Sequence, residues 1–172
     1  ETAHANITAY HRAQVHDAAR YEDDGLVVRE LRRSVDRAGL YVPSAAAPLL
    51  STVLMTAVPA AVAGVPELAL CTAPGPDGAV DDGILAAAAI AGVREVHRVA
   101  GPAAIGALAY GTESIRPVDV IVGPGSARVA QAKREVASLG LVGVPSSFAG
   151  PSEVVVLADA AAVTDDVAID VV

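Results

Sequence analysis

Hydrophobic positions along the chain fall into short apolar runs separated by turn-forming residues. Three such runs, residues 68–72, 95–99 and 118–122, each lie close to a stretch with helical character, at residues 83–91, 103–110 and 127–137, and a fourth run follows at residues 153–157. Strands that alternate with helices of this length predict βαβ units and therefore a mostly parallel sheet. The Val, Leu and Ile content of the strands indicates that both faces of the sheet are covered. The pattern predicts an α/β fold, a small Rossmann-like open sheet covered by helices on both faces, with ligands at the carboxyl ends of its strands.

The N-terminal part of the chain is more polar. Residues 1–20 predict a polar helix that the acidic turn at residues 22–25 ends. The next two apolar runs, residues 26–28 and 39–42, flank a charged stretch. Their pattern fits either a hairpin or a short helix and leaves both open.

From Pro48 onward the character of the sequence changes. Residues 49–58 predict a buried helix with Pro59 near its middle or end and Gly64 as its stop. We therefore divide the chain into an N-terminal helix with its connecting segment, residues 1–38, and a Rossmann-like domain, residues 39–172.

Composition and charge exclude several classes of function. Of the 172 residues, 53% are hydrophobic but only 3% are aromatic, so the core must consist of Ala, Val, Leu and Ile. The net charge of −8 argues against a nucleic-acid partner or an anionic membrane surface. No apolar run reaches the roughly 18 residues that span a bilayer. The lone Cys71 forms no internal disulfide, and we expect a cytoplasmic protein.

Few residues outside the turns are candidates for catalysis or ligand binding. The Gly-Pro-Gly-Ser run at residues 123–126 follows a strand and is the best physical candidate for an anion site, although any βα turn needs such residues. We interpret His97 as a surface or hydrogen-bonded residue and Asp119 as a solvent-facing strand residue. We interpret Cys71 as a core residue, and we expect Asp81 or Asp82 to cap a helix. Lys133 and Arg134 fall in the last turns of their helix, where cations are favoured.

Several segments form a recognisable pattern along the chain, namely residues 39–43, 51–60, 62–65, 105–112, 118–125, 132–134 and 149–153. Taken together and in this order, these segments resemble the histidinol dehydrogenase family. The resemblance implies the central, cofactor-binding, Rossmann-like part of an enzyme that is a homodimer and uses zinc and NAD. That enzyme oxidises an amino alcohol to a carboxylate in two hydride transfers. We expect a truncated, diverged homologue rather than a piece cut from an ordinary member.

The resemblance implies three cofactor-binding positions, two of them altered. Tyr41 matches the cofactor-contacting tyrosine of the family. Ala103 stands where the family has a cofactor-binding Gln, and Ser126 where it has a cofactor-binding Asn. Ala offers no hydrogen bond and Ser reaches less far than an amide, so the NAD contacts are degraded and NAD binding stays an open possibility.

The remaining site residues come from the resemblance and from their polarity. Ser152 matches a substrate-contacting serine, and Tyr110 is a further polar residue that could line the cleft on the substrate side. Tyr41 and Glu153 are the only acid/base-capable pair that we assign as catalytic. The family's zinc ligands and catalytic Glu-His pair match no residue of this sequence, so we expect no metal site and no zinc.

Three functional hypotheses follow. In the first, the protein has lost the zinc- and NAD-dependent oxidation and binds a hydrophobic small molecule in the vacated cleft, as a non-redox cyclase or isomerase of specialised metabolism. In the second, it is an NAD-binding dehydrogenase domain that needs a partner chain. In the third, it is a non-catalytic binding module. In each case we expect a homo-oligomer, most simply a dimer, because the apolar chain lacks the family's other domains.

Overall fold

The computed structural model describes residues 1–45 and 47–145, and the strand expected at residues 153–157 lies outside them. The described elements, in chain order, are α1 (Thr2–Ala13), β1 (Arg20–Asp23), β2 (Leu26–Arg29), β3 (Arg37–Val42), α2 (Leu50–Val62), β4 (Glu67–Thr72), α3 (Asp82–Ile90), β5 (Glu95–Arg98), α4 (Gly101–Tyr110), β6 (Val120–Val122) and α5 (Ala127–Ser138).

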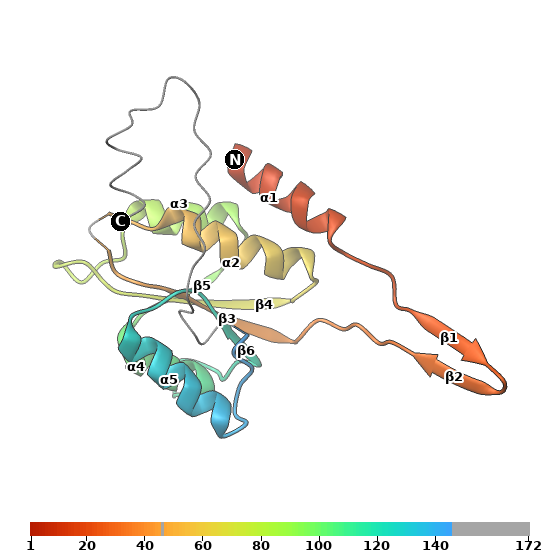
Figure 1. Ribbon diagram of the computed structural model, residues 1–172. Coiled ribbons are helices and arrows are strands. Elements are labelled where there is room, and N and C mark those ends of the chain that lie inside the picture. The colour runs from red at the N-terminus through yellow and green to blue at the C-terminus, as the bar shows by residue number, and fades with distance from the viewer. Residues whose placement is uncertain (46, 146–172) are drawn as a thin grey trace, which may run out of the picture.

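Four of the strands form one parallel sheet in the order β5-β4-β3-β6. A short segment after α5 extends it, because the Ile121 amide donates to the Gly143 carbonyl at 2.9 Å and the Gly143 amide donates to the Asp119 carbonyl at 2.8 Å. Helices α2 and α3 cover one face, and α4 and α5 cover the other (Figure 1). The predicted α/β fold with both faces of the sheet covered is therefore confirmed.

Alternation along the strands builds two cores. Leu40, Val42 and Leu70 pack with the buried side of α2 and α3. Tyr41 and Cys71, one residue out of phase, pack with α4 and α5, as the two-residue period of a strand requires.

Small residues let the layers approach closely. A Cβ atom on Gly39 would lie 3.0 Å from the Leu108 side chain of α4, so this strand position accommodates little more than hydrogen.

Asp81, one of the two residues predicted to cap a helix, caps α3. Its carboxylate accepts hydrogen bonds from the Gly83 amide at 2.8 Å and from the Ile84 amide at 3.3 Å.

The order of the strands creates a switch point. From β3 the chain moves outward through β4 to β5 and then returns to place β6 on the other side of β3. The loops that leave β3 and β6 therefore run to opposite faces of the sheet, and a crevice between such loops is where open α/β sheets bind ligands.

The N-terminal region differs from the prediction in two respects. Helix α1 ends at Ala13 rather than near residue 20. The acidic turn does not stop that helix; it closes a β-hairpin, in which Asp24 and Gly25 adopt positive φ values of 42° and 79° and Arg20 pairs with Arg29. The apolar runs at residues 26–28 and 39–42 therefore neither pair with one another nor form a helix. The first belongs to β2, which pairs with β1 in the hairpin, and the second belongs to β3, which joins the parallel sheet.

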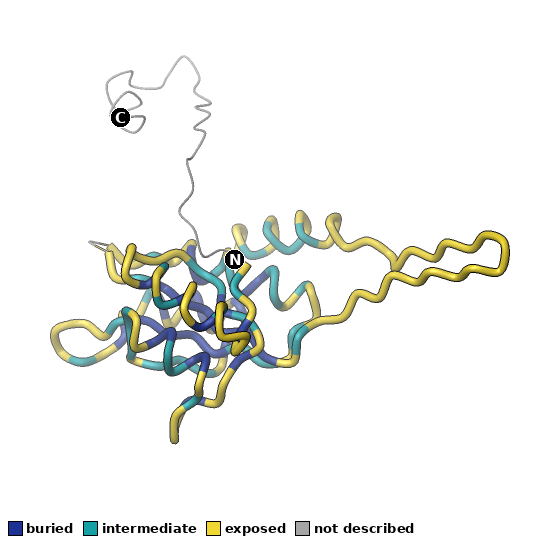
Figure 2. The backbone as a smooth tube through the Cα atoms, turned by 60° about the horizontal axis from the view of Figure 1, so that its bottom comes forward, coloured by how far each residue is buried: buried dark blue, intermediate teal, exposed yellow. Residues whose placement is uncertain are grey.

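The hairpin projects from the rest of the protein (Figure 2). All eight residues of β1 and β2 are exposed, including Tyr21, Leu26 and Val28. The predicted boundary between residues 38 and 39 stays a prediction, although β3 itself begins at Arg37. Within the part of the chain that the structure describes, no helix is long and apolar enough to cross a membrane.

Candidate functional site

The candidate site lies at the carboxyl edge of the sheet, at the switch point between β3 and β6. The β3–α2 loop starts at Pro43 and the β6–α5 loop starts at Gly123. Because α4 and α5 both follow parallel strands, their N-termini open at this same edge. The sequence prediction of a ligand site at the carboxyl ends therefore coincides with the topological switch point.

Tyr41 is buried beneath this edge of the sheet rather than exposed to solvent. It is only 3% exposed, and its hydroxyl accepts a hydrogen bond from the Gly101 amide at 3.0 Å. Helix α4 has no side-chain cap at its N-cap residue Ala100, so Tyr41 satisfies one of the free amides of this helix from the neighbouring strand. In this structure the tyrosine connects β3 to α4, and its assignment as an acid/base group remains a prediction.

The β6–α5 loop is packed tightly over Tyr41. Gly123 has a φ of +113°, and a Cβ atom there would lie 2.0 Å from the Tyr41 carbonyl oxygen. A Cβ atom on Gly125 would lie 2.3 Å from Val129 and 3.4 Å from the Tyr41 ring. Both glycines of the Gly-Pro-Gly run are therefore required by the contact of the loop with the protein itself.

A buried lysine holds the same loop from the side of the core. Lys133 is 2% exposed, and its ammonium group donates to the Gly123 carbonyl. Burial lowers the pKa of Lys133 below its usual value. The sequence placed this residue among the helix-ending cations, and the structure shows instead that it faces inward.

The two altered cofactor positions are both accessible. Ala103 lies in the first turn of α4 and Ser126 is the N-cap residue of α5, and both are exposed. The Ser126 side chain makes no capping hydrogen bond, so its hydroxyl is available to a ligand. Tyr41, Ala103 and Ser126 thus share the carboxyl edge of the sheet.

The other predicted site residues do not join this group within the described residues. Tyr110 is the last residue of α4 and is 60% exposed. It lies at the amino edge of the sheet, since the neighbouring Leu108 carbonyl accepts from the Val118 amide just before β6. Ser152 and Glu153 fall outside the residues that the structure describes.

A cavity of about 610 Å³ opens beside the switch point, between the loops that follow β3 and β4. Prolines, alanines and the aspartates Asp77, Asp81 and Asp82 together make up most of its wall. Thr72 also lines it and is 5% exposed. Sequence reasoning did not identify this cavity, although the Pro-, Gly- and Asp-rich stretch at residues 73–78 signals a wide loop after β4.

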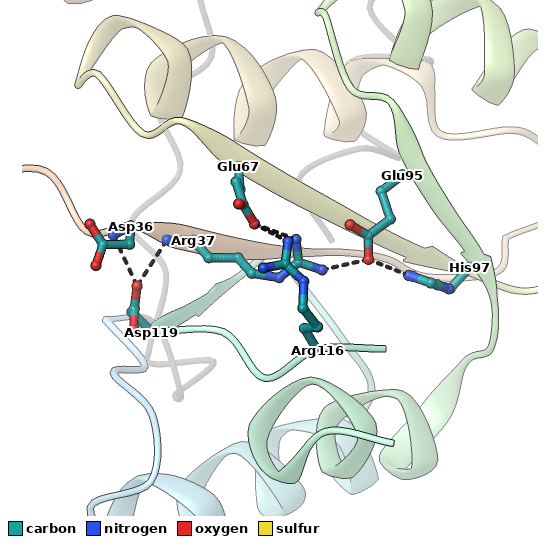
Figure 3. A network of polar contacts seen from close by, with 7 residues as sticks. All are labelled: Asp36, Arg37, Glu67, Glu95, His97, Arg116 and Asp119. Atoms are coloured by element: carbon teal, nitrogen blue, oxygen red, sulfur yellow. Dashed lines mark hydrogen bonds and ion pairs between the residues drawn. The ribbon is translucent and has the colours of Figure 1, made fainter. Parts of the chain in front are cut away.

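A network of polar side chains lies at the opposite, amino edge (Figure 3). Arg37 reaches across the sheet to Glu67 on β4 and Glu95 on β5, and His97 contacts the same Glu95 oxygen at 2.6 Å. The predicted hydrogen-bonded role of His97 is thereby confirmed. Asp119 is also structural here, because its carboxylate accepts from the Asp36 and Arg37 amides at 2.9 and 2.8 Å.

Nothing in the described part of the chain supplies a metal centre or a reactive thiol. Among residues 1–45 and 47–145, no three His, Cys, Asp or Glu side chains group in a way that could hold a metal ion. Cys71 is fully buried, as predicted, and burial raises the pKa of its thiol to about 12. A thiol in such surroundings is a core residue rather than a nucleophile.

Comparison with known proteins identifies the family. The family profile described as histidinol dehydrogenase matches residues 1–172. The histidinol dehydrogenase of Xanthomonas euvesicatoria pv. vesicatoria (strain 85-10) is 46% identical over 171 residues, which cover 99% of this chain and 39% of that protein. The histidinol dehydrogenase of Bacillus subtilis (strain 168) is 46% identical over 166 residues, which cover 96% of this chain and 38% of that protein.

A solved structure agrees with these relatives. The crystal structure of histidinol dehydrogenase from Elizabethkingia anophelis superposes with a TM-score of 0.84 at 37% identity, covering 98% of this chain and 39% of that chain. The chain therefore spans about 39% of the length of the relatives that it matches. The resemblance noted in the sequence is confirmed: this chain belongs to the histidinol dehydrogenase family.

Proposed function

We propose that this chain binds NAD at the switch point of its sheet and supplies the dinucleotide-binding part of a histidinol dehydrogenase-type oxidation of an amino alcohol. The observation that carries the proposal is the intact β6–α5 loop. It is held between Tyr41 and Lys133, with an exposed Ser126 and the uncapped N-terminus of α5 beside it. Such a loop offers backbone amides to a diphosphate.

The residues present fit the dinucleotide in part. The Ser126 hydroxyl can donate or accept a hydrogen bond at the carboxyl edge, whereas Ala103 contributes only a methyl group there. Ala103 is nevertheless exposed, so no described side chain covers this position. Thr72 and the aspartates of the neighbouring cavity add polar groups that suit the hydroxyls of a ribose.

The chemistry of oxidation divides between the cofactor and the protein. NAD, when bound, accepts a hydride. The residues of this chain orient the dinucleotide and keep the β6–α5 loop in place; the Tyr41 hydroxyl is engaged with the Gly101 amide. The described residues do not fit a zinc ion, so no step is assigned to zinc on this chain.

Calorimetry with NAD tests the proposal, and two substitutions that restore the family's side chains sharpen it. Ala103→Gln and Ser126→Asn each add an amide at an exposed position of the site, so each should tighten NAD binding by severalfold. Ala86→Gln adds the same amide to an exposed position of α3 and serves as the control. The proposal is wrong if neither the unaltered chain nor the Ala103→Gln/Ser126→Asn double variant binds NAD.

A second candidate function is the binding of a hydrophobic small molecule in the vacated cleft, without redox chemistry. The loss of both family amides and the apolar part of the 610 Å³ cavity favour it. Loss of the oxidation and a cyclase or isomerase role find no support in the comparisons and stay predictions. An apolar dye that binds the unaltered chain but not Ala79→Trp, which fills the cavity, would favour this candidate, especially if NAD does not compete with the dye.

The expected homo-oligomer and the cytoplasmic location also remain predictions. The exposed apolar residues of the hairpin, such as Leu26 and Val28, fit a surface that another chain or domain covers. Sedimentation equilibrium of the chain decides between a monomer and a dimer.

A further inference from the structure

Lys133 occupies a position that its helix would ordinarily give to an apolar residue. The buried residues of α5 are Val129, Lys133 and Val136, which form the stripe that faces the core. Lys133 is 2% exposed and is the only lysine of the chain. A methionine of similar length would fill this space without the cost of burying an ammonium group, so packing alone does not account for a lysine here.

The contact that Lys133 makes is with the loop, not with another charged residue. Its ammonium donates to the Gly123 carbonyl, the first residue after β6. Gly123 is already pressed against the Tyr41 backbone at a φ of +113°. The loop is therefore fixed on one side by β3 and on the other by a cation of α5.

We propose that Lys133 is a positioning residue, whose buried ammonium holds the β6–α5 loop in the shape that receives the diphosphate of a nucleotide and favours that anion by its charge. The inference deepens the proposed function and rests on it. A positive charge beneath the loop adds to the free amides at the start of α5, and both favour an anion at the same place.

In the described part of the chain, the elements that pack around Lys133 place no other charged side chain beneath the loop. Helix α4 presents apolar side chains to α5, and β6 carries no titratable group. Strand β3 contributes Tyr41 at this edge and Arg37 only at the far end, where Arg37 binds two carboxylates. The remaining charged residues of α5, namely Arg128, Arg134 and Glu135, are exposed.

The pH dependence separates a charge role from a packing role. Burial lowers the pKa of Lys133 from its usual 10.5, so Lys133 loses its charge at a lower pH than an exposed lysine does. Anion affinity should then fall as the pH rises through the lowered pKa. Folding stability should change in the opposite direction, because the unfolded chain keeps its proton up to about 10.5 and the penalty for the buried charge disappears first in the folded chain.

The test uses the chain with ADP-ribose, whose diphosphate keeps the same charge over this pH range, and with adenosine as a neutral probe. Lys133→Met removes charge and donor, and Lys133→Gln keeps a donor without charge. We expect both variants to bind ADP-ribose at least about tenfold more weakly, with adenosine affinity unchanged. Arg134→Gln, which removes an exposed charge from the next position, should change neither affinity by more than about twofold.

The pH titration is a second, independent readout. The unaltered chain should lose affinity for ADP-ribose as the pH rises through the lowered pKa of Lys133, and Lys133→Met should show no such loss. The inference is overturned if both Lys133 variants bind ADP-ribose as tightly as the unaltered chain. Equal losses for ADP-ribose and adenosine, or identical pH profiles, overturn it as well.

Failure of the proposed function gives a different result. If the unaltered chain binds neither NAD nor ADP-ribose, the proposed function falls, and amide exchange decides the inference without any ligand. Amides of residues 123 and 125–127 that exchange at least about tenfold faster in Lys133→Met, while β3 and β4 are unchanged, uphold the positioning of the loop. Unchanged exchange of the loop amides overturns it.

Discussion

Replacing Arg37 by methionine should destabilise the sheet by about 2–3 kcal/mol at neutral pH. The Arg37 side chain is 7% exposed and donates to Glu67 at 3.0 Å and to Glu95 at 2.5 Å, which ties β3 to β4 and β5 (Figure 3). Hydrogen bonds between charged groups contribute about 1.5–3 kcal/mol each. Glu67 is 42% and Glu95 33% exposed, so water compensates part of each loss and the sum stays at the low end.

The cost of Arg37→Met should depend on pH. The Arg37 hydrogen bond holds the pKa of Glu95 below its usual 4.5, and His97 lowers it further against the opposing effect of burial. A carboxyl group whose pKa is lowered by folding stabilises the protein above its usual pKa and loses that contribution as the pH falls through the lowered value. The difference in unfolding free energy between the two proteins should therefore be constant at neutral pH and shrink below about pH 4.5.

Urea denaturation at a series of pH values measures this difference. Arg116→Met is the matched control, since Arg116 also binds Glu67 but is 69% exposed, and it should cost less than about 1 kcal/mol. A loss of under about 0.5 kcal/mol for Arg37→Met at pH 7, or a loss that stays constant into acid, would show that the network does not tie the strands together.

Three further outcomes are expected. Gly123→Ala should destabilise by more than about 3 kcal/mol, because its Cβ atom would meet the Tyr41 carbonyl at 2.0 Å, whereas Gly106→Ala, with open space around it in α4, should stabilise by about 0.5–1 kcal/mol in the same urea assay. Tyr41→Phe should cost about 1 kcal/mol, since the Gly101 amide loses its acceptor, and equal stability would argue that water replaces the hydroxyl. Limited chymotrypsin digestion should cut first within residues 20–31, since an isolated two-stranded hairpin is marginally stable and Tyr21 and Leu31 are exposed; first cuts in β3 or β4 would contradict this.

The strands and helices of the sheet could be predicted because local signals and tertiary packing agree there. The β4 run at residues 67–72 is apolar, short and bounded by Pro66 and the turn after Thr72, so the chain itself encodes both ends. In the N-terminal region the signals conflict. The acidic residues around Asp24 predict a helix stop, whereas the Asp-Gly pair, which adopts positive φ in the structure, is typical of the hairpin turn that forms.

The charged residues were harder to place than the apolar ones. Long side chains such as Lys133 and Arg37 can reach either solvent or a distant partner, and spacing along one element does not tell which. Lys133 shares the spacing of Val129 and Val136, which marks the buried stripe, but its charge led to the opposite interpretation. Arg37 meets Glu95 only because β4 lies between β3 and β5, which is a property of the strand order.

The two edges of the sheet differ in how their polar groups are engaged. At the amino edge the carboxylates of Glu67, Glu95 and Asp119 are all engaged with the protein, and among the described residues the buried Arg37 Nε has no hydrogen-bond partner. At the carboxyl edge α5 begins without a side-chain cap, and its N-cap residue Ser126 is exposed. Free amides at the start of a helix favour an anion. We therefore infer that an anionic ligand is favoured at the carboxyl edge, where the buried ammonium of Lys133 contacts the same loop.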